Sequence, residues 1–92
     1  MKILLTGNAQ KAYNKINEPD KTRLNRAMYK LAKNPPDGDI VKLEGRDGYR
    51  GRFGGWRIMF DIDYNYIDPE TNEKGAVTVF DIATRGGVYK GA

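Results

Sequence analysis

The chain has 92 residues, a formal charge of +4 at pH 7 and a sequence pI of about 9.4, and it contains no cysteine, histidine or serine. Without cysteine, disulfides and thiolate metal sites are excluded. Without histidine, the chain lacks the commonest metal ligand and the commonest general base. A serine nucleophile is excluded as well, so any catalysis must use lysine, arginine, tyrosine, threonine or carboxylate groups, or the backbone.

The length suits one domain, residues 1–92, with a small core. The N-terminal sequence MKILLTGNAQ holds only a short apolar run, shorter than a signal peptide or a membrane-spanning helix needs. We therefore expect a cytoplasmic protein with no membrane partner. The positive charge fits an anionic partner, such as nucleic acid or an acidic protein.

The first elements are predicted to be a strand and a short helix. Lys2–Thr6 is a short apolar run before a glycine and is typical of a strand. Thr6 or Asn8 is expected to cap the helix that follows. That helix carries its apolar residues on one face, namely Ala9, Ala12, Tyr13 and Ile16.

A second helix is predicted to start at Asn17 or Glu18, because Pro19 suits a first helical turn, and to run to about Asn34. Its core stripe is expected to comprise Leu24, Ala27, Met28 and Leu31. The basic residues on its other faces are interpreted as solvated, namely Lys21, Arg23, Arg26, Lys30 and Lys33.

The rest of the chain is predicted to be β-structure. Its expected segments are the turn Asn34–Asp39, the lead-in strand Ile40–Gly45, the strand Gly48–Phe53, the turn Gly54–Gly55, the strand Trp56–Ile67, the polar loop Asp68–Gly75 and the strand Ala76–Arg85. The long strand after the glycine turn is expected to bury one face, made of Trp56, Ile58, Phe60 and Ile62.

The predicted order is β-α-α-β-β-β, which indicates an α+β fold with two N-terminal helices packed on one face of an antiparallel sheet. The opposite face of the sheet would then be left to solvent or to a ligand.

Positive charge is concentrated in the predicted strands. The window from Lys42 to Arg57 has two acidic residues, Glu44 and Asp47, against five basic ones, namely Lys42, Arg46, Arg50, Arg52 and Arg57. We take Lys42, Arg46 and Arg50 as candidate substrate-binding residues.

Three of these arginines are predicted to share one sheet face. Arg50 and Arg52 are two residues apart on a strand, and a two-residue turn at Gly54–Gly55 would pair Arg52 with Arg57 and Phe53 with Trp56. Like charges placed opposite each other are unfavourable without a counter-ion. Since guanidinium groups bind phosphate oxygens in bidentate geometry, a phosphodiester is a natural ligand.

The alternative is that these arginines are solvated strand residues, with their stems covering the sheet and their charged groups in water. Glu44, Asp47 or Asp61 would then neutralise them as ordinary surface ion pairs.

The sequence KLEGRDGYRGRFGGWRIMFDID, followed by VTVFDIATRGGVYK, resembles the RelE/ParE toxin superfamily, and it is closest to the RelE-like branch of toxin–antitoxin systems. The helical region with LAKNPPDGDIVKLEG fits the same family, so the resemblance covers nearly the whole chain. It implies an mRNA interferase, an endoribonuclease that enters the ribosome and cleaves mRNA. It also implies a cognate antitoxin protein, the ribosome and mRNA as partners. The RNA's own 2′-hydroxyl attacks, so no metal or other cofactor is implied.

The resemblance also implies the site. The basic pair of the family falls at Arg50 and Arg52, its hairpin arginine at Arg57, its late-strand arginine at Arg85 and its C-terminal tyrosine at Tyr89. The expected catalytic residues are therefore Arg52, Arg57, Arg85 and Tyr89. Arg52 and Arg57 would clamp the scissile phosphate, and Arg50 a neighbouring one. Arg85 would stabilise the leaving 5′-oxygen or relay a proton to it, and Tyr89 would orient or deprotonate the 2′-hydroxyl.

Two rival functions stay open. ParE-like relatives share the scaffold but inhibit DNA gyrase, and they generally lack the full set of basic residues and tyrosine. The other rival is a catalytically weak relative that only binds RNA or an antitoxin.

Overall fold

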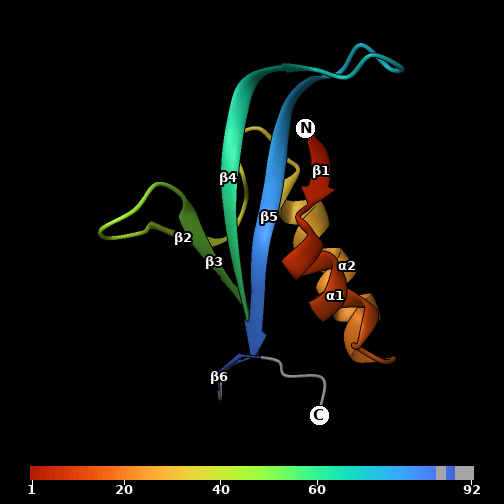
Figure 1. Ribbon diagram of the computed structural model, residues 1–92, viewed down its shortest axis with the longest axis vertical. Coiled ribbons are helices and arrows are strands. Elements are labelled where there is room, and N and C mark those ends of the chain that lie inside the picture. Colours follow the sequence, from red (N-terminus) through yellow and green to blue (C-terminus); the bar gives the residue numbers. More distant parts are fainter. Residues whose placement is uncertain (85–86, 89–92) are drawn as a thin grey trace.

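Two helices cover one face of a β-sheet in the computed structural model, which describes residues 1–84 and 87–88 (Figure 1). The elements in chain order are β1 (Lys2–Leu5), α1 (Gly7–Asn14), α2 (Asp20–Leu31), β2 (Asp39–Lys42), β3 (Tyr49–Phe53), β4 (Trp56–Ile67), β5 (Lys74–Thr84) and β6 (Gly87–Val88). The predicted α+β class and the packing of both helices on one sheet face are confirmed.

The sheet runs in the order β1-β5-β4-β3-β2, and β6 pairs with the end of β5. Neighbours from β2 to β5 are antiparallel, as predicted, but β1 lies parallel to β5, with Lys2 opposite Ala76 and Leu5 opposite Val79. The sheet is therefore mixed and not wholly antiparallel. Because both helices intervene between β1 and β2, no hairpin fixes the direction of β1, and its apolar residues pack beside β5.

The start of α1 agrees with the sequence, whereas α2 starts later than predicted. The Ala9 N–H donates a hydrogen bond to Thr6 Oγ1 at 3.3 Å, so Thr6 is the predicted cap of α1. Before α2, the Glu18 carboxylate accepts hydrogen bonds from the Thr22 N–H at 2.8 Å and from its hydroxyl at 2.7 Å. The α2 helix begins at Asp20 with Pro19 at its N-cap, after the predicted start at Asn17 or Glu18. It ends at Leu31, before the predicted end at Asn34.

The core forms where α2 meets the central strands. The predicted stripe of α2 is buried, and so are the predicted core residues Trp56, Ile58 and Phe60 of β4. Gly51 of β3 faces the same core, and a Cβ added there would lie 2.7 Å from the Phe53 ring and 3.4 Å from Leu31. Glycine at this position therefore allows Phe53 and α2 to pack closely over β3.

The β3–β4 turn has the geometry that its glycines predict. Gly54 has a φ of +59°, whereas Gly55 has no positive φ. A positive φ at only the first central residue is typical of a type II′ hairpin turn, which matches the twist of the flanking strands. Phe53 then pairs with Trp56, as predicted.

Candidate functional site

The sheet face opposite the helices carries three of the predicted arginines. Gly51 and Ile58, which face the core, alternate with Arg50, Arg52 and Arg57 along β3 and β4. Arg52 lies directly opposite Arg57 across the hairpin, which confirms the predicted register. The fold therefore places two guanidinium groups as cross-strand neighbours on the open face.

Arg52 is already paired with a carboxylate. Its Nε and a terminal nitrogen lie 2.9 and 2.7 Å from Asp39 Oδ2, and Asp39 is its register partner on β2. Sequence reasoning had named Glu44, Asp47 and Asp61 as neutralising groups and had placed Asp39 in a turn. Because both side chains of the actual pair are about half exposed, at 53% and 54%, water screens it and its contribution to stability is small.

Arg50 is more buried than Arg52. It lies between Val41 of β2 and Met59 of β4 in the register of the sheet. Its Nε is buried, and it has no hydrogen-bond partner among the residues that the structure describes. An unsatisfied buried donor costs free energy, so the Arg50 side chain is held in this position at some expense of stability.

A cavity of about 320 Å³ joins the open face to the tip of the hairpin. It is lined by Asp39, Arg52, Arg57, Trp56 and the turn Gly54–Gly55. Arg57 is exposed, and within the described part of the chain it makes no hydrogen bond or ion pair. The cavity therefore brings Arg52 and Arg57 together around a space that admits an anion.

The structure does not bring the remaining candidates into this cavity. Lys42 is exposed and lies opposite Tyr49 in the register of the sheet. Tyr49 stacks on the buried ring of Phe60, so both Tyr49 and Lys42 are on the sheet face that carries the core, opposite to the arginine face. The Arg46 guanidinium lies 4.3 Å from the centre of the Phe80 ring, in a cation–π contact.

The predicted residues Arg85 and Tyr89 lie outside the described residues, so their placement stays a prediction. For the short strand between them, β6, the structure describes the backbone. Val88 pairs with Ala83, which in turn lies opposite Arg57.

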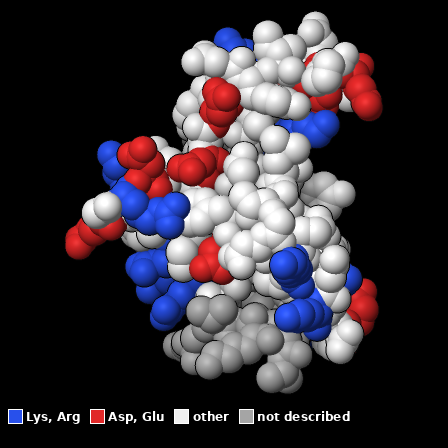
Figure 2. Space-filling model, in the orientation of Figure 1, with Lys and Arg blue, Asp and Glu red and all other residues white. Residues whose placement is uncertain are grey.

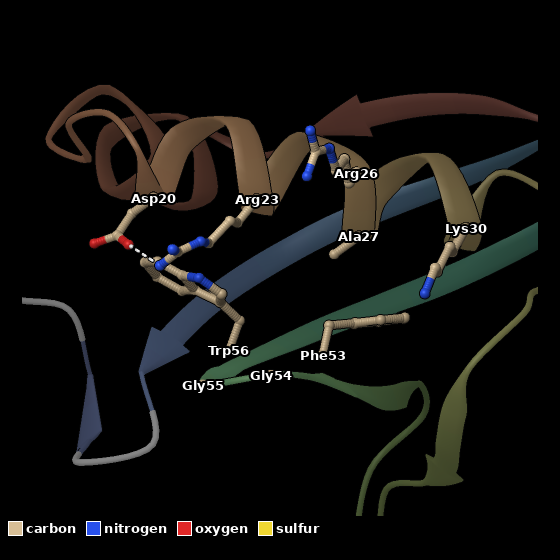
Figure 3. A pocket seen from close by; sticks show the side chains of 9 residues that line it. All are labelled: Asp20, Arg23, Arg26, Ala27, Lys30, Phe53, Gly54, Gly55 and Trp56. Carbon is tan, nitrogen blue, oxygen red and sulfur yellow. Dashed lines mark hydrogen bonds and ion pairs between the residues drawn. The ribbon is translucent and has the colours of Figure 1, made fainter.

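A second cavity, of about 580 Å³, lies on the other side of the glycine turn, between α2 and the hairpin (Figure 3). It is lined by three basic residues of α2, namely Arg23, Arg26 and Lys30. The sequence had placed these residues on a solvated helix face, because nothing in the pattern of α2 indicates what lies opposite it. Their spacing at positions 23, 26 and 30 places them on one helix face, and this spacing is the sequence signal that could have indicated a shared basic surface.

The charges of the molecule are unevenly spread on the surface. In Figure 2, lysine and arginine atoms gather on the side where Figure 1 shows β2 and β3, while acidic atoms mix with them higher on the same side. Arginine stays protonated in proteins and presents a fork of donors, so this surface can bind phosphate and stabilise negative charge. Proton transfer would need another group.

No family model matches the sequence, and no curated protein matches it either. A search of solved structures finds a chain from the crystal structure of the archaeal RelE–RelB complex of Pyrococcus horikoshii OT3. The similarity covers 92% of this chain and 94% of that chain, with a TM-score of 0.56 and 20% sequence identity.

The chain has the RelE-like fold. The resemblance noted in the sequence is thereby confirmed at the level of the fold. Within the RelE-like fold, the open sheet face beside the β3–β4 hairpin carries the arginine cavity described above. Among the described helices of the chain, none is both long and apolar enough to cross a membrane.

Proposed function

We propose that this protein is the toxin of a toxin–antitoxin pair and acts in the cytoplasm as an endoribonuclease that cleaves mRNA on the ribosome. The RelE-like fold supports a toxin, since the neighbour in the structure search comes from a RelE–RelB complex. The observation that carries the nuclease assignment is the arginine cavity, in which Arg52 and Arg57 lie opposite each other on an open sheet face.

The chemistry follows from what these residues can do. The 2′-hydroxyl of the RNA attacks the adjacent phosphorus while the bond from phosphorus to the 5′-oxygen breaks. The products are a 2′,3′-cyclic phosphate and a 5′-hydroxyl. Arg52 and Arg57 would bind the non-bridging oxygens and stabilise the charge that develops on them. Arg50, with its buried Nε unsatisfied by described residues, would hold a neighbouring phosphate.

The proton steps belong to residues outside the described ranges. Tyr89 would orient the 2′-hydroxyl or accept its proton, because nearby positive charge favours the ionised phenol. Arg85 would stabilise the leaving 5′-oxygen or relay a proton to it, and with that proton the oxygen leaves as the 5′-hydroxyl. Because the site offers few acid–base groups, positioning of the mRNA by the ribosome would supply much of the rate.

An antitoxin partner is part of the same proposal. A basic surface with neighbouring aromatic side chains suits an acidic segment that folds when it binds. Such a segment would inhibit the enzyme by covering Arg52 and Arg57.

The test is cleavage of a reporter mRNA during translation, mapped by primer extension, with wild-type protein and the Arg57→Ala and Arg57→Lys variants. We expect cuts confined to the translated region with the wild type, at least a hundredfold slower cleavage with Arg57→Ala and partial activity with Arg57→Lys. Lys11→Ala, an exposed change on α1, is the matched control. Intact mRNA together with DNA breakage would favour gyrase inhibition instead. Intact mRNA without DNA breakage would favour a relative that only binds.

A further inference from the structure

The groove between α2 and the hairpin has charged walls and an apolar floor. In Figure 3, Arg23 and Lys30 extend from α2 toward Trp56 and Phe53, and Ala27 lies between them. Asp20, the one acidic residue of this lining, contacts Arg23 at 3.5 Å. Because both side chains are largely exposed, at 66% and 49%, this ion pair is weak and leaves Arg23 open to another anion.

The groove and the arginine cavity are separated only by the glycine turn. Gly54, Gly55 and Trp56 line both spaces. Both glycines are exposed, and a Cβ built at either of them would meet no atom within 4 Å. The turn is therefore a low, unobstructed ridge between two basic depressions.

The two depressions hold most of the excess charge of the chain. Together their linings contain five basic and two acidic side chains, a net formal charge of +3 out of +4 for the whole chain. Like charges gathered around a ridge repel one another unless an anion lies among them. A ligand with negative charge at regular intervals would relieve the repulsion on both sides of the turn.

We infer that a single-stranded RNA bound at the arginine cavity continues over the Gly54–Gly55 turn into the α2 groove, where Arg23 and Lys30 each bind a flanking phosphate. This inference rests on the proposed function and extends its binding site. Positively charged grooves that follow the backbone are the usual way in which proteins hold single strands.

The groove would recognise the backbone and not the bases. Trp56 is only 7% exposed, so little of its ring is available for stacking, and Phe53 is half-buried. The basic residues are exposed, which suits phosphate contacts that carry no sequence information. The α2 groove should therefore add affinity without adding sequence preference.

An acidic peptide is the rival occupant of the groove. A nucleic acid fits better because it carries one charge per nucleotide along its length, and so reaches both depressions without a particular order of side chains. A bare ridge of two glycines suits a strand that passes over it, whereas a peptide would find no side chain there to pack against.

The first experiment measures fluorescence anisotropy of a labelled 2′-O-methyl oligouridylate dodecamer, which cannot be cleaved, with intact protein at about 50 and about 200 mM salt. The variant Arg23→Ala/Lys30→Ala is compared with Lys11→Ala/Lys15→Ala, which removes the same charge from exposed positions beyond the groove. We expect about tenfold weaker binding for the first variant, with the salt slope reduced by about 1.4 for two lost phosphate contacts. The control should change binding less than about twofold.

A second pair of variants tests the path across the turn. Gly55 has open space and no positive φ, so Gly55→Glu and Gly55→Lys should both fold. Gly55→Glu should weaken binding of the dodecamer at least fivefold, and Gly55→Lys should strengthen it. Equal effects of the two changes, or effects of the α2 variant no larger than those of its control, would overturn the inference. Tighter binding of polyglutamate than of the RNA in the α2 groove would also overturn the inference.

The failure of this inference can be told apart from that of the proposed function. If wild-type protein cleaves mRNA during translation but does not bind the dodecamer, or binds it independently of Arg23 and Lys30, the α2 path is wrong and the nuclease assignment stands. If the dodecamer binds as expected but mRNA stays intact, the path is supported and the nuclease assignment fails.

Discussion

Arg52 and Asp39 lie opposite each other on β3 and β2, and two nitrogens of the guanidinium contact the same carboxylate oxygen. Both residues line the arginine cavity. The pair places a negative charge beside the guanidinium, so Asp39 would compete with a bound phosphate for Arg52.

Replacing Asp39 with asparagine should therefore strengthen RNA binding. We expect Asp39→Asn to raise the affinity for the oligouridylate probe several-fold at low salt, because it removes the competing charge. The free energy of unfolding should change by less than about 1 kcal/mol, since the ion pair is exposed. Anisotropy and urea denaturation check the two parts. Weaker binding would mean that Asp39 acts mainly by orienting Arg52.

For Arg50, in contrast to Asp39, we expect a substitution that weakens RNA binding without lowering stability. Arg50→Met keeps an unbranched stem between Val41 and Met59 but removes the buried Nε that lacks a described partner. We expect a free energy of unfolding equal to the wild type or higher by about 1 kcal/mol, together with weaker RNA binding. Arg50→Ala, which also loses the stem, should be less stable than Arg50→Met. A marked loss of stability in Arg50→Met would show that the guanidinium is satisfied in the free protein.

The two glycines of the hairpin turn should respond differently to alanine. Gly54 has a φ of +59°, whereas Gly55 has no positive φ, and both have space for a methyl group. We expect Gly54→Ala to lower the free energy of unfolding by about 1–2 kcal/mol, and Gly55→Ala to leave it nearly unchanged. Urea denaturation of both variants is the measurement. Equal losses would indicate a turn conformation other than the one described.

Asp68 should contribute to the pH dependence of stability. Its carboxylate accepts a hydrogen bond from the Glu70 N–H at 3.0 Å and one from Lys2 at 3.1 Å, and these bonds lower the pKa of Asp68 below its ordinary value of 3.8. Because the pKa is lower in the folded state, this stabilisation is fully present above the unfolded pKa. It is lost as pH falls through the folded pKa.

The matching variant is Asp68→Asn. It should lower the melting temperature at neutral pH and should flatten the loss of stability below about pH 4. Asp47→Asn, an exposed change, serves as the control and should leave the acid limb as in the wild type. If stability falls as steeply below about pH 4 in Asp68→Asn as in the wild type, other carboxylates dominate the acid dependence of stability.

The parts of the site that local signals determine were predictable. The glycine pair fixed the hairpin turn, and from it the pairing of Arg52 with Arg57 followed. The burial of Trp56 and Phe60 followed from the alternation along β4.

The parts that depend on distant contacts were not predictable. Asp39 follows a proline-rich turn, so no local pattern indicates that it joins β2 opposite Arg52. The parallel pairing of β1 and the groove beside Arg23 depend on how elements far apart in the chain pack together. Periodicity within one element carries no information about such packing.

Gly51, which lies beneath the Phe53 ring, stands between two arginines, and this alternation ties the position of both guanidinium groups to the alignment of the strand. If β3 slipped by one residue against its neighbours, Arg50 and Arg52 would turn toward the helices, and a bare backbone position would face the substrate. The misaligned state would bury two cations without partners, which is far more costly than a misplaced apolar side chain. The arginines thus raise the free energy of a misaligned hairpin, in addition to forming the basic surface of the correctly aligned one.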